Sequence, residues 1–165
     1  MVYKRGFMNK IKIMFVCHGN ICRSPMAEFV MKSLVEKSSA TDEIYIESSA
    51  TSREEIGNGI YPPAAHSLSL HGIACDGHHA RQFTINDYNE FDMVIVMEDY
   101  NKRNLTRLIG CDCKGKVWKL LDFIANEPAP GIGGDISDPW YHGNFDKTYN
   151  EILSGCKALM TYLGY

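Results

Sequence analysis

Apolar runs and helix-like segments alternate along most of this chain. Residues 11–16 form a near-continuous apolar run, which predicts a strand buried on both faces of a parallel sheet. From Pro25 onward the apolar residues are spaced so that they fall on one face of a helix. Pro25 suits the first position of that helix, with Ser24 before it as the N-cap. The pattern therefore predicts a strand, a short loop and a helix in direct succession.

The same alternation continues to the end of the chain. Further strands are predicted at residues 43–50, 91–98 and, within a less regular run at 116–123, 116–120. Further helices are predicted at residues 62–72, 99–110 and 144–165, with Asp99 as a cap and Gly72 as a stop. The Pro- and Gly-rich residues 126–139 indicate a loop. Because strands alternate with helices, we expect a parallel sheet with helices on both faces.

Length and composition indicate one globular domain that is large enough for a proper core. The chain has 165 residues, of which 45% are hydrophobic and 22% charged. A net charge of −3 without a basic block disfavours nucleic acid as a partner. No apolar run reaches the ~18 residues that span a membrane, and the N-terminal residues do not resemble a signal peptide. We therefore expect a cytoplasmic protein.

The cysteines are not spaced like a disulfide framework, and reduced thiols are expected in the cytoplasm. The chain has six, at positions 17, 22, 75, 111, 113 and 156. Cys111 and Cys113 lack the second pair that a zinc site needs. Cys156 falls on the apolar stripe of the last predicted helix, so core packing is expected. For His78, a hydrogen bond behind the loop of residues 17–24 is favoured over a metal.

Residues 17–24, Cys-His-Gly-Asn-Ile-Cys-Arg-Ser, connect the first predicted strand to its helix. A loop in this place presents backbone N–H groups to a concave space that attracts an anion. Gly19 allows a close turn, and Asn20 tolerates a left-handed conformation better than most residues. The planar guanidinium of Arg23 can hold two oxygens of a phosphate. The loop is therefore a candidate phosphate-binding site.

Cys17 lies at the end of the strand, at the floor of this loop. The positive surroundings should lower the pKa of its thiol toward or below neutrality. Ser24 could donate a hydrogen bond to the thiolate. The pattern indicates a nucleophile aimed at the phosphorus atom of a bound phosphate.

A second segment, residues 135–145, offers an acid for the leaving group. Asp138 precedes a proline, so its backbone is held extended. An aryl ester leaves as a phenol of pKa about 10, so an acid at the leaving oxygen is useful. Trp140 and Tyr141 could form walls around an aromatic ring. Core packing of one of the two is the alternative.

These two segments, "VCHGNICRSP" and "DPWYHGNF", resemble the low-molecular-weight protein tyrosine phosphatase family. Weaker similarities lie at residues 47–52, 71–82 and 91–101, so that the resemblance covers about residues 8–163. It implies a phosphatase domain at 8–165 behind an N-terminal extension at 1–7. It also implies a single three-layer α/β domain, with a four-stranded parallel sheet in the flavodoxin-like order 2-1-3-4.

The resemblance implies hydrolysis of phosphotyrosine through a phosphocysteine. Cys17 is the expected nucleophile, Arg23 the group that binds phosphate, and Asp138 the general acid and then the base. No metal or other cofactor is expected, because Arg23 and the loop amides supply the positive charge. Ser48 and His78 match the outer supports of the loop. The expected substrate-binding residues are His18, Gly19, Asn20, Ile21, Cys22, Ser24, Trp140 and Tyr141.

Several alternatives stay open at this point. Arg53 and Glu54 stand where the family often has an aromatic residue, so the choice of flanking residues in the substrate is open. Ile21 favours phosphotyrosine over phosphoarginine, the alternative substrate. Cys22 could form a reversible disulfide with Cys17, or simply pack as a small buried residue.

Two other kinds of protein share part of this pattern. A thioredoxin-coupled arsenate reductase needs further cysteines, and the third predicted strand ends without one. A non-catalytic phosphate-binding module would have lost one of the three reactive side chains. The expected partner is a phosphotyrosine-containing protein or a small aryl phosphate, with no nucleic acid and no membrane. A monomer or a weak dimer is expected.

Overall fold

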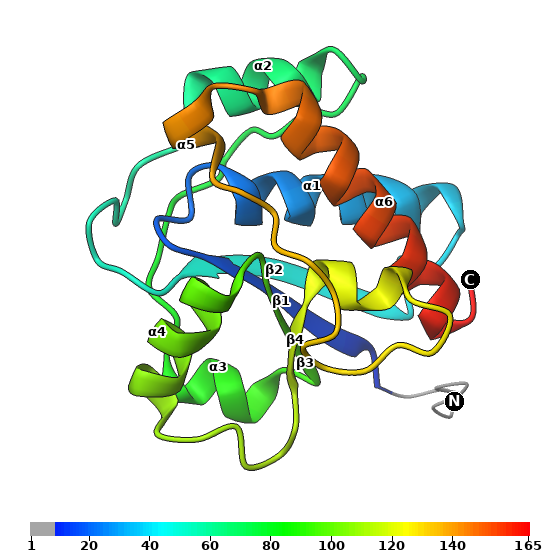
Figure 1. Cartoon of the computed structure of the whole chain (residues 1–165). Helices are drawn as coiled ribbons and strands as arrows, with labels where there is room; N and C mark the ends of the chain where they lie inside the picture. Colours follow the sequence, from blue (N-terminus) through cyan, green and yellow to red (C-terminus); the bar gives the residue numbers. More distant parts are fainter. Residues whose placement is uncertain (1–8) are drawn as a thin grey trace.

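A computed structural model describes residues 9–165 (Figure 1). Its centre is a parallel sheet of four strands in the order β2-β1-β3-β4, which confirms the predicted topology. The strands are β1 (Ile11–Cys17), β2 (Ile44–Ala50), β3 (Met93–Val96) and β4 (Val117–Lys119). The predicted extension over residues 1–7 lies outside the described residues.

The central strand β1 is buried almost throughout, because it pairs with a neighbour on each side. It runs parallel to β2 from Ile11↔Ile44 to Cys17↔Ala50, and to β3 from Ile13↔Met93 onward. Parallel pairing places the carboxyl ends of the strands at one edge of the sheet. Ligands of open α/β sheets bind beyond this edge, and Cys17 lies there.

Helices cover both faces of the sheet, as predicted (Figure 1). They are α1 (Arg23–Lys37), α2 (Pro62–Ser69), α3 (Ile85–Glu90), α4 (Asp99–Ile109), α5 (Pro139–His142) and α6 (Phe145–Leu163). A 3-10 helix, η1 (Leu120–Ile124), follows β4 directly. Among the helices of residues 9–165, none is long and apolar enough to cross a membrane.

Alternate residues of β1 pack into two separate cores. Ile13 and Phe15 lie in the larger core with buried residues of α1, α2, η1 and α6. Met14 and Val16 lie in the smaller core, which contains residues of α3 and α4. All four side chains are fully buried. This alternation is the two-residue period of a strand, and here both of its faces are covered.

Some predicted boundaries are wrong, because local hydrogen bonds differ from the expected ones. Helix α1 begins at Arg23, and Ser24 lies within it rather than capping it. The Ser24 hydroxyl instead lies 3.0 Å from Cys17 Sγ. Asp99 is the first residue of α4, and Glu98 holds the N-cap position. Helix α2 ends at Ser69, before the predicted stop at Gly72.

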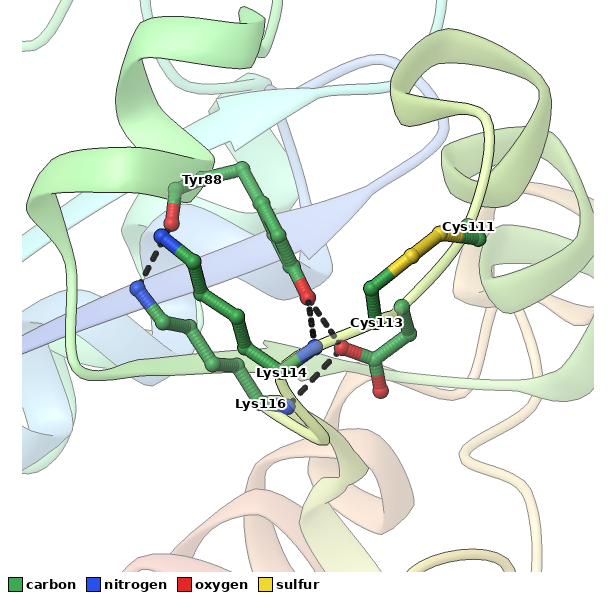
Figure 2. Close-up of a disulfide and its surroundings, with 6 residues drawn as sticks. Tyr88, Cys111, Cys113, Lys114 and Lys116 are labelled. Atoms are coloured by element: carbon green, nitrogen blue, oxygen red, sulfur yellow. Dashed lines mark hydrogen bonds between the residues drawn. A yellow bond between two sulfur atoms is a disulfide. The ribbon is translucent and has the colours of Figure 1, made fainter.

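The described part of the chain contains one disulfide, which the sequence did not suggest. Cys111 and Cys113 are joined in the turn between α4 and β4, so the expectation of reduced thiols is wrong for this pair (Figure 2). The other cysteines, at 17, 22, 75 and 156, are free. Asp112, between the bonded cysteines, accepts hydrogen bonds from the Tyr88 hydroxyl at 2.6 Å and the Lys116 backbone N–H at 2.8 Å. These bonds tie the turn to α3.

Candidate active site

The loop between β1 and α1 curls around the sulfur of Cys17. Asn20 has a left-handed backbone with φ 60°, as its residue type predicts. Its N–H donates to Cys17 Sγ over 3.3 Å. Ser24 Oγ lies 3.0 Å from the same sulfur, on the first turn of α1. A thiolate at this position would therefore have donors on two sides.

The side chain of Asn20 holds the loop against the sheet. It is fully buried, and its Nδ2 donates to Ser24 Oγ and to Ser48 Oγ, each over 2.9 Å. The Arg81 N–H donates to Asn20 Oδ1 over 3.2 Å. His78 Nε2 lies 2.8 Å from the Asn20 carbonyl oxygen, which is the hydrogen bond expected for this histidine. Ser48 and His78 thus contact the loop from behind.

Glu28 is a buried member of this network that the sequence analysis missed. Ser48 donates a hydrogen bond to its Oε2, and Lys32 Nζ lies 2.6 Å from its Oε1. The available signal was its spacing, because Glu28 lies four residues after Ser24 and hence on the same face of α1. Charge alone does not suggest Glu28, because a carboxylate and a bound phosphate are both negatively charged.

Arg23 brings the two distant motif segments together. Its side chain is 1% exposed. Nη1 donates to the Ile136 carbonyl oxygen over 2.9 Å, and Nη2 to Asp138 Oδ2 over 3.1 Å. Burial acts to lower the pKa of Arg23, but the neighbouring Cys17 and carboxylates outweigh burial and raise it. The guanidinium therefore stays charged.

Glu98 is the second carboxylate on Arg23, and it was not among the predicted site residues. Each of its oxygens lies 3.1 Å from a guanidinium nitrogen, so the pair is bidentate. Glu98 follows β3 by two residues. An acidic residue just past the strand beside β1 was the available signal, since the ends of parallel strands meet at one edge.

Cys22 is buried, packed and reduced in this structure. It forms a small apolar cluster with Ile21 and Ala80, against Tyr61 and Phe145. Burial, followed by the charges of Cys17 and Asp138, raises the pKa of its thiol far above the usual range. Cys22 is therefore held as a neutral thiol within the loop.

An aromatic wall stands on one side of the loop. Trp140 and Tyr141 are 53% and 86% exposed, so the alternative of core packing is wrong for both. The ring of Trp140 lies 4.8 Å from that of Tyr61, and the Tyr61 N–H donates to the Ile21 carbonyl over 2.8 Å. Tyr61, which the sequence analysis missed, thus supports Trp140 next to Ile21.

The other side of the loop is charged. His18 Nε2 lies 3.1 Å from Glu54 Oε2, and its ring lies 6.0 Å from that of Tyr100. A Cβ on Gly19 would approach Glu55 Cγ to 3.3 Å, so the Glu55 side chain would have to move by a few tenths of an ångström to admit a larger residue. Glu54 and Arg53 are both exposed. The two sides of the loop therefore differ, one aromatic and one polar.

These contacts combine a thiol, a buried guanidinium and a carboxyl group at one edge of a sheet. Such a loop can hold a tetrahedral oxyanion next to a nucleophile, and Asp138 can exchange a proton at its rim. Fold and site together define an α/β protein with a thiol-bearing oxyanion loop.

Comparisons with known proteins specify this class further. The family model for low molecular weight phosphotyrosine protein phosphatase matches residues 12–164. The chain belongs to this family, whose members are phosphoric monoester hydrolases, so it is an enzyme of this kind.

Individual relatives are similar to this chain in sequence and in structure over nearly its whole length. The low molecular weight protein-tyrosine-phosphatase YfkJ of Bacillus subtilis is 34% identical over 150 residues, which are 91% of this chain and 94% of YfkJ. The crystal structure of YfkJ covers 96% of this chain and 97% of its own, with a TM-score of 0.88 and 33% identity. The Streptococcus pyogenes phosphatase SP-PTP superposes with a TM-score of 0.81, at 37% identity and 93% coverage of both chains.

Proposed function

We propose that the chain hydrolyses phosphotyrosine and related aryl phosphate monoesters through a phosphocysteine on Cys17. The observation that carries the proposal is the contact of Arg23 with Asp138, 115 positions later, beside the loop that surrounds the Cys17 sulfur. This contact joins a nucleophile, a phosphate-binding group and an acid in one site. No metal or other cofactor takes part in the proposed reaction.

In the first step, the phosphate of the substrate binds in the loop. It replaces Asp138 as a partner of the Arg23 guanidinium. Cys17 Sγ attacks phosphorus, and the bond from phosphorus to the aryl oxygen breaks. Asp138 donates its proton to that oxygen, so the product leaves as a neutral phenol. The hydroxyl of Ser24, 3.0 Å from the sulfur, stabilises the thiolate before attack.

In the second step, Asp138 is a carboxylate and accepts a proton from water. The water oxygen attacks phosphorus, the sulfur–phosphorus bond breaks, and Cys17 returns to the thiolate. Inorganic phosphate leaves the loop. Arg23 and the loop amides balance the charge on the phosphoryl oxygens in both steps.

The walls of the loop support the proposed substrate class. The apolar side chain of Ile21 and the exposed ring of Trp140 suit the phenyl ring of a phosphotyrosine better than a guanidinium group. The proposed substrates are phosphotyrosine-containing proteins or small aryl phosphates. The charged side at His18 and Glu54 contacts the residues that flank the phosphotyrosine.

The proposal includes the cytoplasm as the compartment, and a monomer or weak dimer as the working form. Reducing compartments keep most protein thiols free. The disulfide between Cys111 and Cys113 is the feature of this structure that does not fit a reducing compartment.

Hydrolysis of aryl phosphates by wild type, Cys17→Ser and Asp138→Ala tests the proposal. We expect near-complete loss for Cys17→Ser, because a hydroxyl is a far weaker nucleophile than a thiolate at neutral pH. Asp138→Ala should lose about 100-fold or more on phenyl phosphate, and less on para-nitrophenyl phosphate, which needs little acid. A wild-type protein inert toward aryl phosphates, yet active on phosphoarginine or on arsenate with thioredoxin, would refute this assignment.

A further inference from the structure

A buried lysine lies at the same edge of the sheet as the active site, outside the set of residues considered so far. Lys119 is the last residue of β4, and its side chain is 5% exposed. Its Nζ lies 3.0 Å from Asp135 Oδ1 and 3.2 Å from Asp99 Oδ1. Lys119 thus joins the end of the sheet to the start of α4 and to the segment before Asp138.

We use the name acid loop for residues 131–138. Its first part is fixed by the carboxylate of Asp122 in η1, which is fully buried. Asp122 accepts hydrogen bonds from the N–H groups of Gly131 at 2.8 Å and Gly133 at 2.7 Å. It also accepts one from the Lys119 N–H at 2.7 Å. The residues next to β4 therefore determine where the acid loop begins.

The middle of the acid loop is fixed at Asp135 and Ile136. Asp135 Oδ1 accepts from the Asp99 N–H over 3.2 Å as well as from Lys119 Nζ. The next residue, Ile136, is fully buried and donates its N–H to the Met97 carbonyl over 2.8 Å. These contacts lie two and three residues before Asp138, so they limit how far its carboxyl group can move.

The charge of Lys119 keeps two carboxylates together. Burial acts to lower the pKa of Lys119, but its hydrogen bonds to Asp135 and Asp99 outweigh burial and raise it. The ammonium group is therefore charged at neutral pH. Without it, the carboxylates of Asp135 and Asp99 would repel each other, and the acid loop would shift away from the start of α4.

We propose that Lys119 is a positioning residue for Asp138, acting through Asp135 and the acid loop. The inference rests on the proposed function, in which Asp138 donates a proton to the leaving oxygen. Lys119 itself contacts no reacting atom in this scheme. Its loss should therefore impair the proton transfer selectively, and leave phosphate binding and thiolate attack largely intact.

The first test is the kcat/KM of Lys119→Met on phenyl phosphate and para-nitrophenyl phosphate. We expect a loss of about tenfold or more on phenyl phosphate and less than about threefold on para-nitrophenyl phosphate. Asp135→Asn removes the same ion pair from a half-exposed position, so it serves as a second variant if Lys119→Met folds poorly.

Lys116→Met is the matched control. Lys116 lies next to the opposite end of β4, where its Nζ donates to the carbonyl oxygens of Tyr88 at 2.8 Å and Phe91 at 2.7 Å. Its loss also removes a cation from the same strand region, but not from the acid loop. We expect Lys116→Met to lower stability and to leave the ratio of the two kcat/KM values unchanged.

A double-mutant cycle with Asp138→Ala separates positioning from a general structural effect. In the Asp138→Ala protein, the additional change Lys119→Met should alter kcat/KM less than about twofold, since no acid is left to position. The inference would be wrong if Lys119→Met lowered kcat/KM equally on both substrates, or lowered it as much in the Asp138→Ala protein as in wild type. The proposed function would not be affected by either result. If Asp138→Ala showed no dependence on the leaving group, the proposed function would fail, and this inference with it.

Discussion

Arg23 is surrounded by oxygen atoms from three residues that lie in two later segments of the chain. Its contacts are to Ile136, to both oxygens of Glu98 and to Asp138. A fully buried guanidinium needs such partners, because an unpaired buried charge is very costly. The planar fork also binds both oxygens of the Glu98 carboxylate through two separate nitrogens, a bidentate geometry that a lysine ammonium does not offer.

Arg23→Lys should therefore reduce activity strongly although it keeps the charge. We expect kcat/KM on para-nitrophenyl phosphate to fall about 100-fold, as is typical when one preorganised donor to a transition state is removed. Arg53→Lys, at an exposed position, is the control and should change this value little. If the Arg23→Lys variant kept most of the wild-type kcat/KM, the expectation would be wrong, because a point charge would then be sufficient in the loop.

At the scale of elements, α3 depends on its N-terminal cap. The helix has six residues, and Thr84 and Asp87 form a reciprocal capping box at its start. Asp87 also accepts two hydrogen bonds from Arg81, at 2.9 and 3.0 Å. Burial alone raises the pKa of Asp87, but the hydrogen bonds from Arg81 and Thr84 outweigh it and hold the pKa below its ordinary value.

Because the folded pKa is depressed, Asp87 stabilises the fold above its unfolded pKa of about 4, and this contribution is lost at lower pH. Asp87→Asn should lower the free energy of unfolding at pH 7. It should also flatten the decline of stability as the pH falls below about 4. Urea unfolding across this range measures the effect. Glu90→Gln, on an exposed position of α3, is the control, and equal pH profiles for wild type and Asp87→Asn would contradict the expectation.

The turn between α4 and β4 is an element whose covalent state can be measured. In protein prepared without reductant and then unfolded, an alkylating reagent should modify the four free cysteines and spare Cys111 and Cys113. After reduction all six should react. Because the bond closes a very short loop, Cys111→Ser should cost less than about 2 kcal/mol of unfolding free energy. Six modified cysteines before reduction would mean that the bond does not form.

Sequence reasoning succeeded at the element scale where apolar residues repeat over several turns or fill a strand. Helix α6 and strand β1 are examples, since burial on a continuous face leaves a clear pattern. It missed α3 and α5, which are too short for a helical period to show. It also extended the fourth strand to residue 120, although Leu120 opens the 3-10 helix η1, because an apolar run does not distinguish the two.

For the molecule as a whole, the topology could be predicted, and the three motif residues that the sequence singled out lie in one region, but their neighbours could not be predicted. Cys17, Arg23 and Asp138 have fixed spacing or a fixed neighbour in the sequence. Glu98 and Lys119 lie in the site region only because β3 and β4 end at the same edge of the sheet as β1. A sequence shows which strands exist, whereas the partners of a buried charge depend on how the strand ends meet.

The contacts of Arg23 also have a consequence for biosynthesis. Its partners lie 75, 113 and 115 positions further along the chain. A ribosome-bound fragment that ends before residue 138 lacks the carboxylate of Asp138, which completes the set of hydrogen-bond acceptors around the Arg23 guanidinium. Such a fragment lacks part of the proposed active site, so we expect the proposed activity only after most of the polypeptide has emerged.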